Sequence, residues 1–294
     1  MLEFKEVTIT DRQTICQYLN KQENTVSELS FANMFIWRNP YQIHWAEAFG
    51  CMMASYEKNG ELGISFPVGN GDHKAALEEA MTYFKSLNRK PLFFLYSEFA
   101  RDFVETHYGE SVQITNDEGS NDYVYLTSDL IELPGKKYHQ KRNHISAFYK
   151  MYPYTYERIT PENIPECVKL FEQWYQTRMD TPDIHDDLEA KRALFSHYQK
   201  LGVTGGLIRV MGEVAAVDVG EPLNSNTFVV HAEFAHANLR GAFAVINQEF
   251  VRHECAEYTY INREEDMGIE GIRRAKRSYY PVMMAKKYRA VFPE

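Results

Sequence analysis

Residues 204–254 predict three strands followed by a helix, and read TGGLIRVMGEVAAVDVGEPLNSNTFVVHAEFAHANLRGAFAVINQEFVRHE. Runs rich in β-branched and apolar residues predict strands at 204–211, 213–220 and 227–234. The turn Met211-Gly212-Glu213 predicts that the first two strands form a hairpin. A helical pattern then runs from Arg240 to Glu254. This stretch therefore predicts the centre of a domain that combines a sheet with helices.

The same order of elements extends outward on both sides and occurs twice along the chain. Each half predicts a strand, two helices, three strands, a helix, a strand, a helix and a strand. In the first half the expected strands are 2–7, 41–46, 51–57, 63–66, 91–96 and two short ones ending near 126, and the helices are 10–19, 27–37, 73–87 and 98–108. In the second half the further strands are 154–159, 258–261 and an extended 282–292, and the further helices are 161–179, 187–201 and 269–278.

This order is the one found in the acyltransferase fold named for GCN5-related N-acetyltransferases (GNAT). We therefore expect an α/β (α+β) protein with two tandem GNAT-like (acyl-CoA N-acyltransferase-like) domains. Each domain is expected to be a mixed twisted sheet flanked by helices. The join is expected between Thr127 and Pro153, a charged stretch that contains Leu133-Pro134-Gly135. The predicted domains are residues 1–130 and residues 131–294, with catalysis expected in the second.

Composition excludes several classes of protein. The 294 residues carry 32 Lys and Arg against 41 Asp and Glu, and the net charge of −9 argues against a protein that coats nucleic acid. No apolar run approaches the roughly 18 residues of a membrane span, and the charged start lacks a signal-peptide core. We therefore expect a cytoplasmic protein without a transmembrane segment. The spacing of the histidines and cysteines matches no metal-binding motif, so no metal is expected.

The basic residues are unevenly distributed. Residues 136–150 hold five Lys and Arg and no acid, and residues 271–289 hold seven and no acid. Helical periodicity places Arg273, Lys276 and Arg277 on one helix face. Two such strips predict a site for a polyanion, whereas the alternative is a pair of solvated helix faces paired with acids elsewhere.

Three segments resemble the signatures of the DUF2156 family, the C-terminal domain of phosphatidylglycerol lysyltransferase. They are residues 262–280, residues 133–145 and residues 233–250. The resemblance covers nearly the whole chain and implies a pair of fused acetyltransferase-type domains. Its best-known members move an aminoacyl group from a charged tRNA to a membrane lipid. The resemblance therefore implies aminoacyl-tRNA as donor and possible partner, and a small molecule or a lipid headgroup as acceptor.

The expected catalytic residues are Glu233, Asn262 and Tyr279. Glu233 ends a strand where a carboxylate could take the proton of an incoming amine. Tyr279 or its neighbour could donate a proton to the leaving oxygen or sulfur. The alternatives are an ordinary exposed Glu on a strand and an ordinary Tyr packed at a helix end. The expected substrate- or phosphate-binding residues are Lys136, Lys137, Lys141, Arg142, Asn143, Arg240, Gly241, Asn247, Arg263, Arg273, Lys276, Ser278 and Tyr280.

The loop before the helix at 240–254 bears on the donor. GNAT enzymes hold the pyrophosphate of coenzyme A with a Gln/Arg-x-x-Gly-x-Gly/Ala turn at a helix N-terminus. Here the turn is Asn238-x-x-Gly241-x-Phe243, with Asn at the first position and a bulky residue at the last. This departure favours aminoacyl-tRNA over a coenzyme A thioester, which stays the alternative donor.

Three functions are consistent with these observations. The first is transfer of an aminoacyl group from aminoacyl-tRNA to an amine or hydroxyl by direct attack. The second is acetyl-CoA-dependent N-acetylation, and the third is a non-catalytic module that binds tRNA or another phosphorylated ligand. Convergence of Glu233, Asn262, Arg273 and Tyr279 on one cleft would favour the enzyme, and their scatter would remove most of its support.

Overall fold

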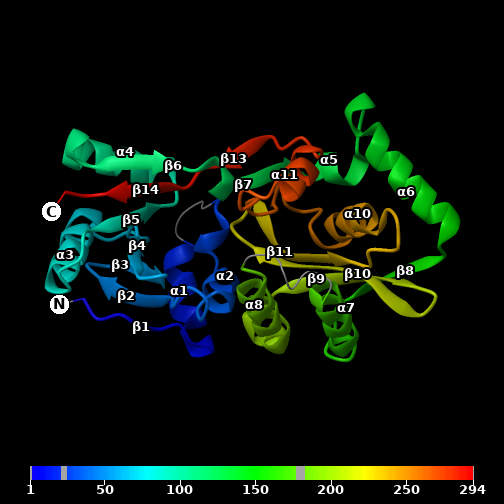
Figure 1. The fold of residues 1–294 in the computed structure, drawn as a ribbon, viewed down its shortest axis with the longest axis horizontal. Helices are drawn as coiled ribbons and strands as arrows, with labels where there is room; N and C mark the ends of the chain where they lie inside the picture. The colour runs from blue at the N-terminus through cyan, green and yellow to red at the C-terminus, as the bar shows by residue number, and fades with distance from the viewer. Residues whose placement is uncertain (1, 21–24, 177–182, 294) are drawn as a thin grey trace. The chain divides into compact units, whose positions relative to one another are not determined.

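The computed structural model describes residues 2–20, 25–176 and 183–293 (Figure 1). The chain divides into two compact units. Unit 1 comprises Met1–Asp122, Glu265–Arg273 and Met284–Glu294, and unit 2 comprises Tyr123–Glu264 and Arg274–Met283. Each of the two seven-stranded sheets is mixed, with one parallel pair of neighbours beside antiparallel pairs.

The sheet of unit 1 has the order β1-β2-β3-β4-β5-β14-β6. Its parallel pair is β4 with β5, and the last strand of the chain, β14, lies between β5 and β6 (Figure 1). The strands are β1 (Lys5–Glu6), β2 (His44–Ala48), β3 (Cys51–Lys58), β4 (Glu61–Ser65), β5 (Leu92–Leu95), β6 (Gln113–Asn116) and β14 (Tyr288–Val291). The helices are α1 (Arg12–Leu19), α2 (Phe31–Ile36), α3 (His73–Ser86) and α4 (Glu98–Tyr108), with short 3₁₀ turns at Ile9–Asp11, Ser27–Leu29, Gly109–Ser111 and Glu118–Ser120.

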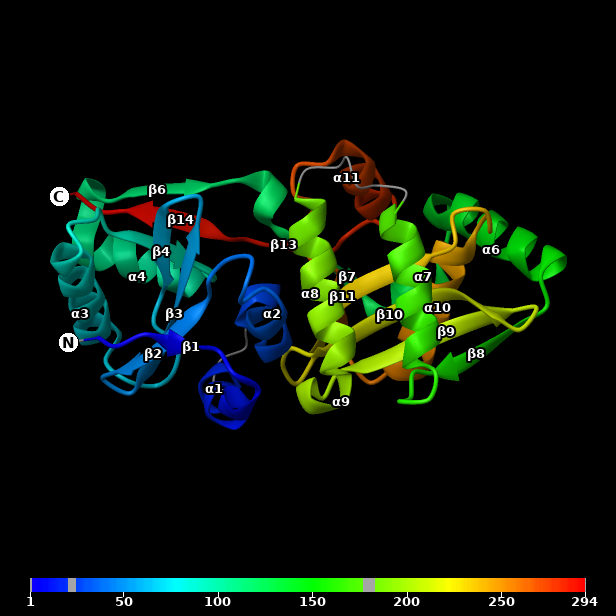
Figure 2. The same ribbon diagram turned by 60° about the horizontal axis from the view of Figure 1, so that its bottom comes forward.

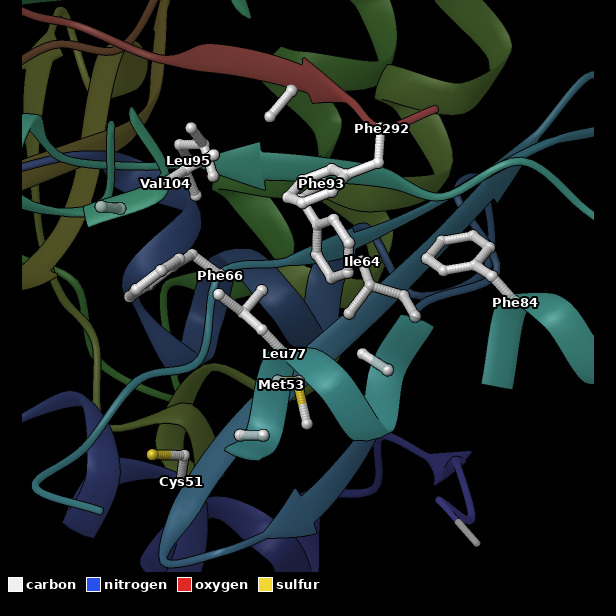
Figure 3. Packing of buried hydrophobic residues seen from close by; sticks show 14 of the residues in the cluster. Cys51, Met53, Ile64, Phe66, Leu77, Phe84, Phe93, Leu95, Val104 and Phe292 are labelled. Atoms are coloured by element: carbon white, nitrogen blue, oxygen red, sulfur yellow. The ribbon is translucent and has the colours of Figure 1, made fainter. Parts of the chain in front are cut away.

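The core of unit 1 forms where α3 packs on one face of this sheet (Figure 3). Leu77 and Phe84 lie on the buried side of α3, and the ring of Phe84 packs edge-on against Phe93 of β5 at 5.7 Å between centroids. Phe292, directly after β14, packs against the other side of Phe93 at 5.3 Å. Burial of these rings removes a large apolar area from water, so this packing also fixes the position of β14.

The sheet of unit 2 has the order β13-β7-β12-β11-β10-β9-β8, and its parallel pair is β11 with β12. Helix α7 covers one face and α10 the other (Figure 2). The strands are β7 (Asp122–Leu126), β8 (Tyr154–Arg158), β9 (Thr204–Val210), β10 (Glu213–Pro222), β11 (Thr227–Ala235), β12 (Tyr260–Asn262) and β13 (Met283–Ala285). The helices are α5 (Thr127–Glu132), α6 (His139–Met151), α7 (Ile164–Gln176), α8 (Ile184–Ser196), α9 (Tyr198–Leu201), α10 (Ala242–Glu254) and α11 (Glu270–Arg277), with a 3₁₀ turn at Lys136–Tyr138.

The predicted element order is confirmed in both halves, as are the mixed sheets flanked by helices. The predicted hairpin at residues 211–213 is confirmed by the pairing of Val210 with Glu213. The predicted end of a helix near residue 179 lies outside the described residues.

The division of the chain differs from the predicted break at residue 130. The first segment of unit 1 already ends at Asp122, because β7 pairs with β12 in the sheet of unit 2. The last strand of the second half instead pairs with β5 and β6 in unit 1. Strand β7 of the first half thus belongs to the second sheet, and β14 of the second half belongs to the first sheet. Each of these strands supplies backbone hydrogen-bond partners to the strands beside it.

The segment expected to join the domains is folded. Residues 127–151 form α5, a 3₁₀ turn and α6, which belong to unit 2. Helix α6 is hard to recognise because only Ile145 and Phe148 are buried on it and its first half is polar. Within residues 2–20, 25–176 and 183–293, no helix is long and apolar enough to cross a membrane.

Candidate functional site

A row of residues crosses four strands of unit 2 in register. Arg158 of β8 pairs with Gly206 of β9, Gly206 with Asp218 of β10, and Asp218 with Glu233 of β11. Side chains of paired residues lie on the same face of a sheet. Arg158 donates a 2.7 Å hydrogen bond to Glu254 of α10, so the row lies on the face that α10 covers. Glu233 therefore points to this face, four residues beyond Val229, the last residue of β11 that pairs with β12.

An ion pair joins Glu233 to Arg263. Nη2 of Arg263 donates to Oε2 of Glu233 over 2.7 Å, and the two side chains are 10% and 19% exposed. Arg263 directly follows β12, whose last residue Asn262 pairs with Val229, four residues before Glu233, so the long Arg263 side chain reaches along β11 to this carboxylate. The guanidinium carbon of Arg263 lies 4.8 Å from the centre of the Tyr279 ring, within reach of a cation–π contact.

A second cation reaches the same ring. Nζ of Lys141, on α6, lies 3.7 Å from the centre of the Tyr279 ring. Burial and, to a lesser extent, the positive charge of Arg263 lower the pKa of Lys141 to about 8, against the opposing effect of Glu233. Glu233, Arg263, Tyr279 and Lys141 are named the Glu233 cluster below. Four separate segments of unit 2 build it.

Asp218 borders this cluster and is fully buried. Both of its carboxyl oxygens lack a hydrogen-bond partner within the described part of the chain, and so does Nη1 of Arg263. Burial raises the pKa of Asp218 well above its usual range, the charge of Glu233 adds to this, and Arg263 opposes it. Burial thus favours the protonated form of Asp218. Buried polar groups of this kind fit an incoming polar group or an ordered water.

A buried histidine, His231, lies beside the site, and the sequence did not indicate it as a site residue. His231 is the extra residue of a β-bulge in β11, and its ring nitrogens lie 2.8 Å from Glu264 and 3.1 Å from Glu221. Burial alone would lower the pKa of His231, but these two carboxylates outweigh it and raise the value to about 9. The histidine is two residues from Glu233, but no pattern in the sequence indicates its partners at 221 and 264.

Two predicted site residues support the backbone around Arg263. The side-chain oxygen of Asn262 accepts a 2.7 Å hydrogen bond from the backbone N–H of Glu264. Nζ of Lys276 donates to the backbone carbonyls of Arg263, at 2.6 Å, and Glu264, at 3.1 Å. Both residues hold the turn that presents the guanidinium, so they are positioning residues.

Other residues of the predicted basic strips also have partners within the protein. Arg273, in unit 1, donates two hydrogen bonds to the buried Asp266, at 2.8 and 3.0 Å. Arg142 donates to the backbone carbonyls of Leu133 and Gly135. Arg273, at the unit 1 end of α11, is therefore engaged with Asp266, and the sequence had suggested it as a phosphate ligand.

The remaining predicted residues lie on the surface of unit 2 or inside its helices. Lys137 pairs with Asp129 at 3.1 Å, Asn143 contacts His139 at 3.3 Å, and Ser278 donates to the carbonyl of Ala275 at 2.6 Å. Lys136, Arg240 and Tyr280 are exposed, whereas Asn247 is buried in α10 and its amide atoms lack a hydrogen-bond partner among the described residues.

The turn before α10 has a packing role. Gly241 has φ +95° and begins α10, and a Cβ atom there would lie 2.7 Å from the backbone oxygen of His144 in α6. Glycine is therefore required for the close approach of α6 and α10. No group of three or more His, Cys, Asp or Glu residues could hold a metal ion within the described ranges.

Comparisons with known proteins agree with this architecture. A crystal structure of a conserved protein of unknown function from Bacteroides thetaiotaomicron is 36% identical, with a TM-score of 0.96 over 100% of both chains. L-PGS from Bacillus licheniformis is 11% identical, with a TM-score of 0.67 over 96% of this chain and 92% of that one. A tandem GNAT protein from the clavulanic acid biosynthesis pathway is 10% identical, with a TM-score of 0.51 over both whole chains. These matches confirm the predicted pair of GNAT-like domains.

An uncharacterized protein of Mycoplasmoides gallisepticum is 26% identical over 177 residues, which is 58% of this chain and 56% of that protein. The chain therefore matches little more than half the length of this relative. The family model described as "Phosphatidylglycerol lysyltransferase, C-terminal" matches residues 20–291 and confirms the resemblance inferred from the three sequence signatures. This chain accordingly belongs to the phosphatidylglycerol lysyltransferase C-terminal family.

Proposed function

We propose that unit 2 transfers an aminoacyl group from aminoacyl-tRNA to an amine or hydroxyl group of an acceptor. The observation that carries the proposal is the convergence of one carboxylate, two cations and a tyrosine, contributed by four segments, in the Glu233 cluster. A carboxylate and partly desolvated cations are the groups that acyl transfer needs.

The reaction needs no covalent enzyme intermediate. The acceptor nitrogen or oxygen attacks the carbonyl carbon of the aminoacyl ester, and a tetrahedral oxyanion forms. The ester bond to the terminal ribose of the tRNA then breaks. The proton lost by the acceptor moves to the ribose oxygen, so atoms and charges balance without a further reactant.

We assign each residue of the Glu233 cluster a role in these steps. Glu233 takes the proton of the acceptor, and its ion pair with Arg263 holds the side chain in position. Lys141 and Arg263 place positive charge where the oxyanion develops, and this charge acts strongly because both side chains are largely shielded from water. Tyr279 separates the two cations with its ring and limits their repulsion.

The choice of donor rests on the family and on the turn before α10. Phe243 is 41% exposed at the place where coenzyme A enzymes of this fold have a small residue, and the Gly241 backbone is occupied in packing against α6. Exposed cations, Lys136 and Arg240, lie on the surface of unit 2, where they can contact a phosphate backbone.

The test is a transfer assay with one labelled aminoacyl-tRNA at a time. Phosphatidylglycerol vesicles and a panel of small amines serve as acceptors, and labelled acetyl-CoA serves as the competing donor. We expect label to leave at least one aminoacyl-tRNA and appear on an acceptor. Arg263→Lys keeps the charge but loses the two-pronged geometry, so it should lower kcat by about ten- to a hundredfold. Transfer from acetyl-CoA alone would contradict the proposed donor.

A further inference from the structure

Unit 1 contains a cavity of about 280 Å³ whose walls are largely aromatic. The rings that line it are those of Trp37, Tyr41, Tyr56, Phe94, Tyr96 and Tyr288. Phe94 alternates along β5 with the core residues Phe93 and Leu95, so it faces away from the packed core seen in Figure 3. The cavity is therefore separate from that core. Its volume lies at the lower end of the range for ligand pockets, which suits a compound of one or two rings.

The aromatic floor of the cavity depends on a glycine. Tyr56 of β3 pairs in register with Gly63 of β4. A Cβ atom on Gly63 would lie 2.4 Å from Cε2 of Phe94, so the glycine leaves room for this ring to lie across β4. The ring centre of Tyr56 lies 5.5 Å from that of Phe94 and 6.3 Å from that of Tyr96, edge-on in both cases. Because these rings hold one another in place, the aromatic surface exists before a ligand binds.

The polar group that decides the ligand is the side chain of Asn33 on α2. Every other residue of α2 is apolar and buried, and asparagine is unfavourable inside a helix. Asn33 is only 8% exposed, and it lines the cavity. Its side-chain amide has no hydrogen-bond partner among the described residues, since its bond to Ser30 uses the backbone N–H. Burial of an unpaired amide is costly, so we expect a polar group in the cavity to pair with it.

Most charged side chains of the lining are engaged within the protein. Nζ of Lys287 lies 2.6 Å from Glu28 and 2.9 Å from Glu265. Arg289 lies 2.8 Å from Glu61. Drawing one partner out of a buried ion pair leaves the other charge poorly compensated, which is strongly unfavourable. A neutral ligand therefore fits this lining better than an ion does.

We propose that this cavity binds a nucleobase, with aromatic rings against its faces and the Asn33 amide against its hydrogen-bonding edge. An amide presents a donor and an acceptor side by side, and each nucleobase carries an acceptor and a donor next to each other on one edge. Every base also has a π-face that stacks on aromatic side chains. An aromatic wall alone accepts any flat apolar molecule, and a buried amide alone holds a water. Together they select a neutral, flat heterocycle with a polar edge.

The experiment is calorimetric titration of the full chain with adenosine, guanosine, cytidine and uridine in turn. Indole serves as the matched ligand, because it is a flat bicycle that lacks the adjacent donor and acceptor. We expect at least one nucleoside to bind at least tenfold more tightly than indole.

A base of this kind has two sources, a free nucleoside and the 3′-terminal adenosine of a tRNA. To separate them, a tRNA that ends in adenosine and the same tRNA without this nucleotide compete with the bound nucleoside. At least tenfold stronger displacement by the intact tRNA identifies the terminal adenosine as the source. Equal displacement by the two tRNAs identifies a free nucleoside.

Three variants separate the contributions. Asn33→Leu keeps the size of the side chain but removes its donor and acceptor, so it should weaken nucleoside binding about tenfold or more and leave indole binding within about twofold. Trp37→Leu removes one aromatic face and should weaken the binding of both ligands about fivefold or more. The control Asn70→Leu makes the same change as the first variant at an exposed position outside the cavity. It should leave both affinities unchanged.

Thermal melting of each variant checks that it is folded. Equal affinity for indole and for every nucleoside, or no nucleoside binding to the folded wild type at about 1 mM, would overturn the proposal. Unchanged nucleoside affinity in folded Asn33→Leu would do so as well. The proposal concerns unit 1 and does not depend on aminoacyl transfer by unit 2, so either can fail without the other.

Discussion

Asp218 lies directly opposite Glu233 across the β10–β11 pair, and the two carboxyl groups have contrasting environments. Glu233 accepts a hydrogen bond from Arg263 and is partly exposed. Asp218 is fully buried, and its oxygens have no hydrogen-bond partner in the part of the chain that the structure describes. Neighbouring acids whose environments separate their protonation states are typical of acid–base sites. Here Glu233 is paired with the Arg263 cation, whereas burial favours the protonated form of Asp218.

The first prediction concerns Asp218. Since burial favours the protonated form of Asp218, Asp218→Asn should change the free energy of unfolding by less than about 1 kcal/mol. Asp218→Leu removes the polar group altogether and should lower transfer while the protein remains folded. Urea denaturation of both variants checks the effect on stability. A large loss of stability in Asp218→Asn would show that Asp218 is ionised in the folded protein.

The second prediction concerns the pH dependence of transfer. The pKa of Lys141 is about 8, and its positive charge is lost above that value. If this charge stabilises the oxyanion, kcat/KM should fall as pH rises above about 8. Lys141→Arg keeps the charge at high pH and should extend the plateau by at least one pH unit. The assay subtracts the spontaneous hydrolysis of the aminoacyl ester at each pH, and a profile identical in both proteins would exclude this role.

The third prediction concerns His231. Its pKa is about 6.5 in an unfolded chain and about 9 in the folded protein. The folded state therefore binds more protons between these values, so the stabilisation is complete below about pH 6.5 and is lost as pH rises to about 9. The loss is about 3 kcal/mol at most. The melting temperature of the wild type should fall over this range, and that of His231→Gln should fall less. The difference between the two proteins isolates the contribution of His231.

The fourth prediction concerns Arg273, which the sequence suggested as a phosphate ligand. Since Arg273 pairs with the buried Asp266, Arg273→Ala should destabilise the protein by about 1–3 kcal/mol. It should leave the salt dependence of tRNA binding unchanged, because the guanidinium is engaged within unit 1. Lys141→Ala should lower the slope of log affinity against log salt by up to about one unit if Lys141 contacts a phosphate. Filter binding at two or more salt concentrations measures both slopes.

Much of the fold could be predicted because strands and helices depend on local patterns. The hairpin at Asn59-Gly60 follows from a dipeptide that accepts positive φ at both positions, and here φ is 54° and 81°. The partners of β7 and β14 could not be predicted, because pairing depends on which edges are free in three dimensions. Helix α6 was missed because its exposed polar half has no apolar period.

Glu233 and Arg263 could be predicted as site residues because each lies near the end of a strand that the sequence predicts. Arg263 directly follows β12, and its side chain reaches Glu233, which lies four residues beyond Val229, the last residue of β11 that pairs with β12. The roles of Asn262 and Lys276 were not predictable, since both bond to backbone atoms of a turn whose shape the sequence does not specify.

The most direct test of the proposed function is the single-turnover rate of aminoacyl transfer by Glu233→Gln. The matched control is Glu157→Gln, which alters a carboxylate bonded to Arg209 at 3.0 Å in the same unit. Glu157 precedes Arg158 on β8, so it lies on the opposite face of the sheet from Glu233. If Glu233 is the base, its variant should be folded and slower by about 10²–10⁴-fold, and the control should transfer at the wild-type rate. A folded Glu233→Gln that transfers as fast as the control would contradict the assignment.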